Sequence, residues 1–338
     1  MNASHERLET LILSLQKCRI VVIGDVMLDR YIHGKVTRLS PEAPIQILEA
    51  HKQNDMAGGA ANVAGKAAEL NAEVTLVGLV GSDAEAGGLR TVLSSWSNLK
   101  MECIADQQRP TTLKTRFISH NQQLLRVDKE HRGFPTGFVL EQLADAAYAA
   151  CATADAVILE DYGKGVLSPE VIAAAIKGAG QSGAPIVVDP NGRDYRRYAG
   201  TTVLTPNLRE AEVAAERPIT DTASLEDVGA ILVNQTGSAL AITREAEGIS
   251  LFRNKPAGTL DHTHIPTVPV EVYDVTGAGD AVAATMAIAL ASGIELAEAC
   301  ALANVAGRVV VRQHGVGTIS QALLLEEVRR GSEATRVA

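Results

Sequence analysis

Short apolar runs that alternate with helix-length segments constrain the fold of this chain most strongly. Residues 19–24 form a β-branched run, and from about residue 140 onward similar runs follow at 156–159, 186–189 and 239–243. Continuous apolar strands of this kind are typical of a parallel sheet that is buried on both faces. Their alternation with helices is the pattern of βαβ winding. We therefore predict an α/β fold in which a mainly parallel sheet carries helices on both faces.

The composition favours one globular enzyme domain that spans residues 1–338. Hydrophobic residues make up 46% of the chain, which is enough for a sizeable core. The net charge of −9 and the aromatic content of 3% indicate neither a basic surface nor a base-stacking platform. We therefore expect no nucleic-acid partner.

Three features of the sequence bear on the compartment. Residues 1–17 mix charged and apolar residues in the manner of an amphipathic helix and do not resemble a signal sequence. No apolar segment reaches the roughly 18 residues that span a bilayer. The four cysteines lack the spacing of a zinc site or of a disulfide framework. We therefore expect a cytoplasmic protein with no membrane partner.

A glycine-rich turn, Asp-Val-Thr-Gly-Ala-Gly-Asp at residues 274–280, is the candidate centre of the chemistry. It lies between a predicted strand at 268–273 and a run of small apolar residues at 281–291, which predicts a buried helix. Glycines can adopt positive φ and lack a Cβ, so successive backbone N–H groups can converge at the positive end of that helix and bind a phosphate. The groups concerned belong to Gly277, Ala278 and Gly279.

Asp280 follows in the first turn of the same helix. A bound phosphate repels a carboxylate there unless the acid has a chemical role, such as accepting the proton of an attacking hydroxyl. The combination predicts phosphoryl transfer with Asp280 as the general base; the alternative is an ordinary turn with an N-capping Asp.

Two other phosphate loops fit less well. A dinucleotide fingerprint lacks its third glycine at Val282, and a near match to a Walker A loop at 59–66 is one residue too long and continues with Ala67.

Polar residues near the first strand form a candidate sugar site. Asp25 and Asp29 follow the strand at the sheet edge where open α/β proteins bind ligands. Gly58 and Gly59 precede the next helix and allow close backbone approach, and Asn62 offers a donor and an acceptor to a polyol. We predict that these residues contact the sugar. Turn and cap chemistry for the aspartates, and helix-end filling for Asn62, are the alternatives.

A small β flap is predicted beside this site, and a surface hairpin without function is the alternative. Two short alternating segments at 31–36 and 44–50, and period-two alternation over 101–130, predict flap segments at about 31–50 and 101–130. Basic residues in or near the flap are either a solvated surface or, if they border the acceptor pocket, the binding site of an anionic substrate. These residues are Lys114, Arg116, Arg126 and Lys164.

The turn at 274–280 resembles the C-terminal signature of the ribokinase-like (PfkB) sugar kinases, and residues 58–64 match the first signature of that family in a loose form. The resemblance extends from residue 21 to about residue 328. Within the family, the chain is most similar to the D-glycero-β-D-manno-heptose 7-phosphate kinases of lipopolysaccharide core assembly, through the strings at 24–31, 38–44, 121–126 and 161–165. This implies transfer of a phosphoryl group from ATP to the C1 hydroxyl of that heptose, which gives the 1,7-bisphosphate.

The same resemblance implies a set of site residues. ATP would lie along Asn207, Thr243, Gly248 and Asn304, with its phosphates over Gly277 to Gly279. Glu245 departs from the family pattern, because a glycine usually stands there. Mg²⁺ would lie near Asn207 and Glu210, although an Asn-x-x-Glu pair is also typical of a helix cap. Asp274 and Thr276 are candidate ligands of K⁺. The sugar side would comprise Asp25, Asp29, Gly58, Gly59, Asn62, Lys114, Arg116, Arg126, Asp161, Lys164 and Asp280.

The resemblance also implies that the flap segments at about 31–50 and 101–130 form a small β-sheet lid. In such kinases the lid covers the sugar and often forms a dimer contact, so a homodimer is implied as well. Two alternatives of function stay open: another sugar or nucleoside kinase of the same fold, and a non-catalytic regulator that only binds a ligand. The presence of Asp280 argues against the regulator. An NAD-dependent enzyme is disfavoured because the dinucleotide fingerprint is missing.

Overall fold

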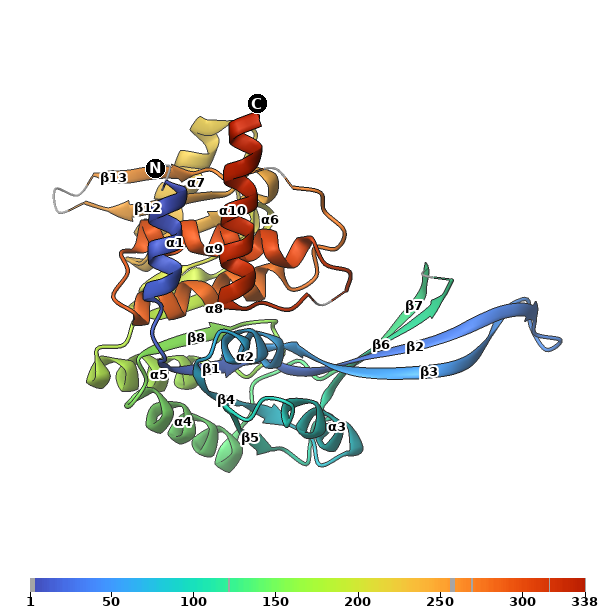
Figure 1. Cartoon of the computed structure of the whole chain (residues 1–338). Helices are drawn as coiled ribbons and strands as arrows, with labels where there is room; N and C mark the ends of the chain where they lie inside the picture. The colour runs from blue at the N-terminus through green and yellow to red at the C-terminus, as the bar shows by residue number, and fades with distance from the viewer. Residues whose placement is uncertain (1–3, 121, 256–258, 269, 316, 338) are drawn as a thin grey trace.

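The computed structural model describes residues 4–120, 122–255, 259–268, 270–315 and 317–337, with side chains up to residue 331. Asn121, in the string 121–126, therefore lies outside the described residues. Within the described part, the main sheet has nine strands in the order β13-β12-β11-β10-β9-β8-β1-β4-β5 (Figure 1). The strands from β5 to β11 run parallel, and β12 and β13 add an antiparallel edge.

The strands of this main sheet are β1 (Arg19–Gly24), β4 (Glu73–Val80), β5 (Leu99–Ala105), β8 (Ala156–Glu160), β9 (Ile186–Asp189), β10 (Val203–Leu204), β11 (Ala239–Thr243), β12 (Ile249–Asn254) and β13 (Leu260–Ile265). Side chains of β1 alternate between the two faces: Ile20 and Val22 join one apolar core, and Val21 and Ile23 join the other. Both faces are therefore buried, as the continuous apolar runs predicted.

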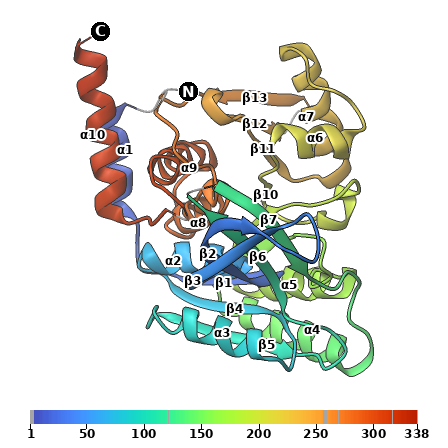
Figure 2. The same cartoon turned by 90° about the vertical axis from the view of Figure 1, so that its right-hand side faces the viewer.

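Helices cover both faces of the sheet (Figure 2). One layer contains α1 (His5–Ser14), α2 (Ala60–Glu69), α3 (Ala84–Leu93), α8 (Ala278–Ala291), α9 (Leu296–Val311) and α10 (Gln321–Val337). The other contains α4 (Gly137–Cys151), α5 (Pro169–Ser182), α6 (Leu208–Ala215) and α7 (Thr222–Thr236). The predicted fold class is confirmed. In the first layer the two ends of the chain meet, because α1 and α10 lie side by side (Figures 1 and 2).

The central helix α8 is buried along most of its length, and its small side chains let it pack against α2 and α9. It begins at Ala278, three residues before the predicted start, so part of the glycine turn is helical. The strand predicted at 268–273 is wrong: no strand is present among the described residues of that segment, and residue 269 lies outside them. The backbone N–H groups of Tyr273 and Asp274 both donate to the Val311 carbonyl at the end of α9, so the segment is attached to a helix and not to a sheet.

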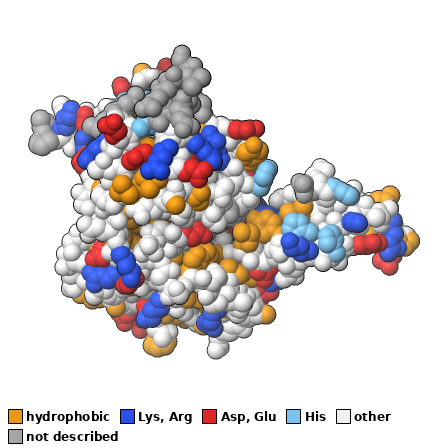
Figure 3. Space-filling view, viewed as in Figure 1, with side chains coloured by type: hydrophobic (Ala, Val, Ile, Leu, Met, Phe, Trp, Pro, Cys, Tyr) orange, Lys and Arg blue, Asp and Glu red, His pale blue; other side chains and the backbone are white. Residues whose placement is uncertain are grey.

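A second sheet has the order β3-β2-β6-β7 in the described part and contains β2 (Val26–Leu39), β3 (Gln46–Gly59), β6 (Thr112–Ser119) and β7 (Gln122–Lys129). We call it the arm, because it projects from the body of the molecule (Figures 1 and 3). Its first hairpin is longer than predicted. One part of the predicted lid is wrong: residues 101–105 belong to β5, which pairs with β4 in the main sheet. An edge strand of the main sheet alternates with the same period of two, so the pattern alone could not separate the two sheets.

The described helices include none that is long and apolar enough to cross a membrane. The four cysteines are free thiols, and three of them are buried. Their isolation agrees with the absence of disulfide spacing in the sequence.

Candidate active site

The Asp280 carboxylate lies in the first turn of α8, with 7% of the residue exposed. Asn62 on α2 donates a side-chain hydrogen bond to Oδ2, and the Tyr162 hydroxyl donates to Oδ1 at 3.4 Å. The helix is preceded by Gly277 at φ 81°, and no side chain caps it. Asp280 is therefore not the cap of an ordinary turn, because its carboxylate faces the polar residues of α2 and of the loop after β8.

The electrostatic surroundings of Asp280 act in opposite directions. Burial raises the pKa of the carboxyl group, because a charge is poorly solvated there. The hydrogen bond from Asn62 and the positive charge of Lys66 lower the pKa and partly offset this effect. A carboxylate with a raised pKa that is still held by a donor and a nearby cation has the properties of a general base.

Two further carboxylates, Glu160 at the end of β8 and Asp189 at the end of β9, face Asp280. The two strands pair with Glu160 opposite Asp189, and one oxygen from each of the three acids lies within 4.8 Å of the others. Neither oxygen of Glu160 has a hydrogen-bond partner among the described residues. Burial and the neighbouring acids raise the pKa of both Glu160 and Asp189 well above the usual range. Such a cluster either shares protons or coordinates a cation.

The glycine turn lies next to these acids. A Cβ built on Gly279 would be 3.9 Å from Asp189 Oδ2, with no other described atom among its near neighbours. The turn that was predicted to bind phosphate therefore borders a carboxylate. A phosphate and a carboxylate repel each other, so these acids oppose an anion at the turn unless they are protonated or a cation neutralises them.

On the predicted sugar side, the two aspartates have different partners. Asp25 is 1% exposed and accepts three backbone N–H groups of the loop after β8, at 2.9, 2.9 and 3.0 Å. Its carboxylate therefore holds that loop, which favours the turn-chemistry alternative. Asp29 accepts from Arg116 Nη1 at 2.7 Å. A Cβ on Gly58 would lie 2.6 Å from Asp29 Oδ2, so the position admits only glycine without a shift of the acid. Gly59 adopts φ 54° where β3 ends.

Asp161 also has structural partners. Its Oδ2 accepts the Tyr198 hydroxyl at 2.6 Å, and its Oδ1 accepts the Gly163 N–H at 2.7 Å. Arg197 Nη1 lies 3.4 Å from the same carboxylate. The acid thus stabilises the loop that carries Tyr162 and Lys164.

The four predicted cations are not equivalent. Arg116 pairs with Asp29, Lys164 pairs with Glu130 at 2.6 Å, and Arg126 pairs with Asp128 at 2.9 Å on an exposed strand. Lys114 has no ion-pair partner within 4.0 Å among the described residues. Its ammonium lies 5.3 Å from the centre of the Tyr162 ring, and burial lowers its pKa. Among these four cations, Lys114 is therefore the one that no acid neutralises at ion-pair distance, although the charges of Asp29 and Asp128 act on it from farther away.

The predicted nucleotide residues lie around the ends of β11 and β13. Asn207 bridges to Thr243, while Gly248, at φ 92°, lies so near Ile265 that a Cβ would be 2.3 Å from the carbonyl oxygen. Asn304 donates to the same carbonyl oxygen at 3.0 Å. These residues share one region, although the amide of Asn304 is already engaged with the backbone.

The predicted metal residues are engaged in local structure. Asn207 and Glu210 form a capping box at the start of α6, with each side chain accepting the backbone N–H of the other residue at 2.9 Å. The contact between Asn207 and Glu210 is therefore a helix cap, which was the alternative to a metal site. Burial raises the pKa of the Glu210 carboxyl group. The negative charge of Glu210 also raises the pKa of Asp189. Asp274 accepts the Thr276 N–H at 2.9 Å in a tight turn.

Sequence reasoning missed the roles of Glu160, Asp189, Tyr162 and Lys66. The two acids had a usable signal, because each ends a buried strand on the edge of the sheet where ligands bind. Tyr162 and Lys66 had none, because their proximity to Asp280 depends on how α2, α8 and the loop after β8 pack.

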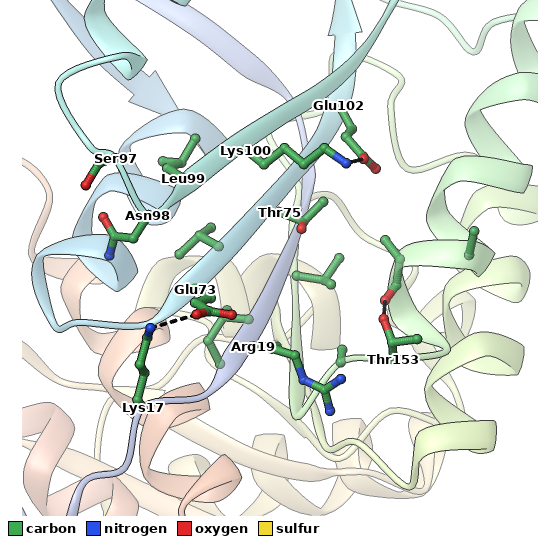
Figure 4. Close-up of a pocket in the computed structure, with 16 residues that line it drawn as sticks. Lys17, Arg19, Glu73, Thr75, Ser97, Asn98, Leu99, Lys100, Glu102 and Thr153 are labelled. Atoms are coloured by element: carbon green, nitrogen blue, oxygen red, sulfur yellow. Dashed lines mark hydrogen bonds and ion pairs between the residues drawn. The ribbon is translucent and has the colours of Figure 1, made fainter.

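A cavity of about 980 Å³ lies away from these residues, at the starts of β1, β4 and β5 (Figure 4). Its three cations have partners in or beside it: Lys17 pairs with Glu73 at 2.7 Å, Arg19 pairs with Asp155 at 2.6 Å, and Lys100 pairs with Glu102. It shares none of the predicted site residues.

The chain is similar to known proteins in sequence and in fold. Residues 17–323 match the pfkB family carbohydrate kinases. The bifunctional protein HldE of Caulobacter vibrioides is 45% identical over 308 residues, which cover 90% of this chain and 62% of that protein. HldE of Granulibacter bethesdensis is 43% identical over 307 residues, covering 89% and 63%. The chain thus spans less than two thirds of the length of these relatives.

Solved structures share the fold at low sequence identity. Ribokinase of Arabidopsis thaliana, complexed with ribose and ATP, superposes with a TM-score of 0.71 at 19% identity, covering 93% of this chain and 99% of that one. Phosphofructokinase-2 from Escherichia coli, in complex with potassium, gives a TM-score of 0.74 at 17% identity, covering 94% and 100%.

Proposed function

Because this chain belongs to the pfkB family of carbohydrate kinases, we propose that it transfers the γ-phosphoryl group of ATP to the C1 hydroxyl of D-glycero-β-D-manno-heptose 7-phosphate. The product, heptose 1,7-bisphosphate, would serve ADP-heptose and lipopolysaccharide core synthesis. One structural observation carries the kinase assignment: Asp280 is buried against Asn62 and Tyr162, directly after the glycine turn. The choice of sugar rests on the similarity to the HldE proteins.

In the proposed reaction, the acceptor hydroxyl lies between Asp280 and the γ-phosphorus. Its oxygen forms a bond to phosphorus, the bond from phosphorus to the β–γ bridging oxygen breaks, and the proton passes to the Asp280 carboxylate. Asn62 and Tyr162 orient that carboxylate. The amides of Gly277, Ala278 and Gly279 stabilise charge on the transferred group. ATP lies along Asn207, Thr243, Gly248 and Asn304.

Mg²⁺ fits the acids beside the glycine turn. Both oxygens of Glu160 lack a hydrogen-bond partner among the described residues, and the carboxylate of Asp189 lies beside them. Carboxylate oxygens are the hard ligands that Mg²⁺ prefers. The charge of Glu210 adds to the negative potential at Asp189. When bound, the ion neutralises charge on the phosphate oxygens. K⁺ is proposed at the Asp274 and Thr276 turn, where a carboxylate is present. A comparison of turnover in K⁺ and Na⁺ buffers tests that site.

The acceptor phosphate is proposed to bind Lys114. This residue lies beside Tyr162, whose hydroxyl contacts Asp280, so a sugar with one end at Asp280 can extend toward the ammonium. Arg116 and Lys164 already pair with acids, and Arg126 lies farther out on β7 with Asp128. The arm is proposed to act as a lid that closes over this sugar.

We also propose a homodimer formed through the arm, in a reducing cytoplasm. The arm exposes the apolar side chains Leu39, Ile45, Leu124, Leu125 and Val127. Burial of such a surface against a second copy would stabilise both copies. Sedimentation of Leu125→Lys against the wild type tests this, with Val213→Lys on α6 as an exposed apolar control outside the arm.

A panel of acceptors tests the function. ADP release is measured with heptose 7-phosphate, free heptose, fructose 6-phosphate, ribose and adenosine, with Asp280→Asn as the background. Heptose 7-phosphate is expected to give the highest kcat/KM. Preference for another acceptor would support the kinase activity but reject heptose 7-phosphate as the acceptor. Ligand binding without turnover on any acceptor would favour the non-catalytic regulator.

A further inference from the structure

Arg308 and Glu327 form a buried ion pair to which the proposed reaction assigns no role. Arg308 lies on α9 and is 8% exposed, and Glu327 lies on α10 and is 5% exposed. Arg308 Nε donates to Glu327 Oε1 at 3.0 Å, and Arg312 Nε lies 3.3 Å from Glu327 Oε2. Stability alone rarely accounts for a buried ion pair, because apolar side chains of similar volume often stabilise a fold as well or better. The pair therefore requires a further explanation.

The guanidinium group of Arg308 also holds the segment that follows β13. Its Nη1 donates to the Thr267 hydroxyl at 3.0 Å, two residues after the strand ends. One helical turn earlier on α9, the Asn304 amide donates to the Ile265 carbonyl oxygen at 3.0 Å. Positions four apart share one face of a helix. Asn304 and Arg308 therefore hold the segment 265–267 from the same face of α9.

The segment 265–267 borders the proposed ATP site. A Cβ on Gly248 would lie 2.3 Å from the Ile265 carbonyl oxygen and 2.8 Å from the Thr267 backbone nitrogen. Gly248 and Asn304 are two of the four side-by-side residues proposed to bind ATP, and both contact this segment. A shift of the segment would therefore change the shape of the ATP site at two of its residues.

We propose that Arg308 is a positioning residue for nucleotide binding, which acts through Thr267 and is itself fixed by Glu327 on α10. A guanidinium group presents its donors in one rigid plane, so this side chain can set the spacing of α9, α10 and the segment 265–267. The inference rests on the ATP site proposed above. Arg308 contacts the segment and not the nucleotide, so its effect belongs to ATP affinity and not to the chemical step.

Titration calorimetry with ATP, together with steady-state kinetics, tests the proposal on two single variants. Arg308→Met removes the contacts with both Glu327 and Thr267, whereas Thr267→Val removes only the hydroxyl acceptor. We expect Kd for ATP to rise about 3- to 30-fold in Arg308→Met, in the range of couplings carried by residues that do not touch the ligand. Thr267→Val should raise it in the same direction. Both variants should keep kcat at saturating ATP, and KM for the best acceptor, within about twofold of wild type.

A double variant and a control separate this role from a purely structural one. If Arg308 acts through Thr267, combining Arg308→Met with Thr267→Val should weaken ATP binding no further than Arg308→Met alone, because the same contact is lost only once. Arg312→Met is the matched control, since it removes the other cation beside Glu327 and leaves the hydrogen bond from Arg308 to Thr267. It should leave Kd for ATP nearly unchanged, even where it lowers Tm.

Several outcomes would overturn the proposal and leave the ion pair as a link between α9 and α10. These are an unchanged Kd for ATP in Thr267→Val, an equal rise in Arg312→Met, multiplied effects in the double variant, and a fall of kcat without a change in Kd. Should Arg308→Met not fold, Thr267→Val compared with Arg312→Met decides by the same expectations. A wild type that binds no ATP would reject the proposed ATP site as well, whereas a wild type that binds ATP as tightly as its variants do would reject only the role of Arg308.

Discussion

At the scale of single residues, the replacement of Asp280 by Asn tests the proposed base most directly. The amide keeps the size of the side chain but cannot accept the hydroxyl proton, so we expect turnover to fall by roughly 10²- to 10⁴-fold. ATP affinity, measured by titration calorimetry, should change little, because Asn207, Thr243, Gly248 and Asn304 lie on other elements and the backbone amides of the glycine turn are unchanged. Near-normal turnover in the purified variant would reject Asp280 as the base.

The buried Glu160 predicts how stability depends on pH. The pKa of Glu160 in the folded protein is raised well above the ordinary value of 4.5. At any pH between the ordinary and the raised pKa, the folded protein therefore binds more protons than the unfolded chain. In the absence of a divalent cation, the free energy of unfolding should therefore fall as pH rises above about 4.5. Glu160→Gln should weaken this dependence, and Mg²⁺ should raise Tm at pH 8 in the wild type more than in the variant. Thermal melts at several pH values, with and without Mg²⁺, measure both effects; equal Mg²⁺ shifts would place the ion elsewhere.

Residue types and their positions predicted the polar edge of the sheet, but not the partner of each side chain. Asp25 was assigned to sugar hydroxyls, yet its three donors belong to a loop 137 to 141 positions later in the chain. Asn207 and Glu210 show the opposite case, since a capping box is a local interaction and was foreseen as the alternative. Contacts between distant segments depend on packing, which no local pattern records.

At the scale of elements, the turn after β11 stores a local strain. Glu245 adopts φ 48°, in the left-handed region that favours glycine. We expect Glu245→Gly to raise the free energy of unfolding by up to about 1 kcal/mol, because relief of the strain exceeds the added flexibility of the unfolded chain. Ala246→Gly in the same turn is the control and should lower it. Denaturant unfolding measures both, and a loss in both variants would contradict the strain argument.

Elements with a strong apolar pattern were predicted well, and those with a weak pattern were not. Strand β1 begins and ends at the predicted residues 19 and 24, because its apolar run ends in glycine. The segments 101–105 and 268–273 failed for different reasons. The first was assigned to the wrong sheet by a periodicity common to both sheets. The second forms no strand in its described residues, and Tyr273 at its end donates a hydrogen bond to the end of α9.

At the scale of the whole molecule, the arm and the body meet where Lys114 on β6 lies over Tyr162 of the loop after β8. If this junction holds the distal phosphate, Lys114→Met removes a charge-assisted contact of about 1.5 to 3 kcal/mol, which is roughly a 10- to 100-fold change in affinity. We expect KM for heptose 7-phosphate to rise accordingly, with KM for ATP nearly constant. Arg126→Met on the exposed strand is the matched control and should be almost silent. An equal rise in both variants would indicate a diffuse electrostatic effect.

The sequence predicted the main sheet and its two helical layers more completely than it predicted the arm. A mainly parallel sheet with two helical layers is required by apolar strands that alternate with helices. The reach of β2 and β3 was underestimated: the alternating segments at 31–36 and 44–50 cover only part of two strands that run from Val26 to Leu39 and from Gln46 to Gly59.

The pairing of α1 with α10 has a consequence for how the protein is made. Leu11 and Ile12 on α1 belong to the apolar core that also contains Leu324 and Val328 of α10. On a ribosome the first of these helices emerges some three hundred residues before the second, as their positions show. During that interval its apolar stripe has no final neighbour, so the nascent chain must keep α1 from associating with other molecules until α10 is released.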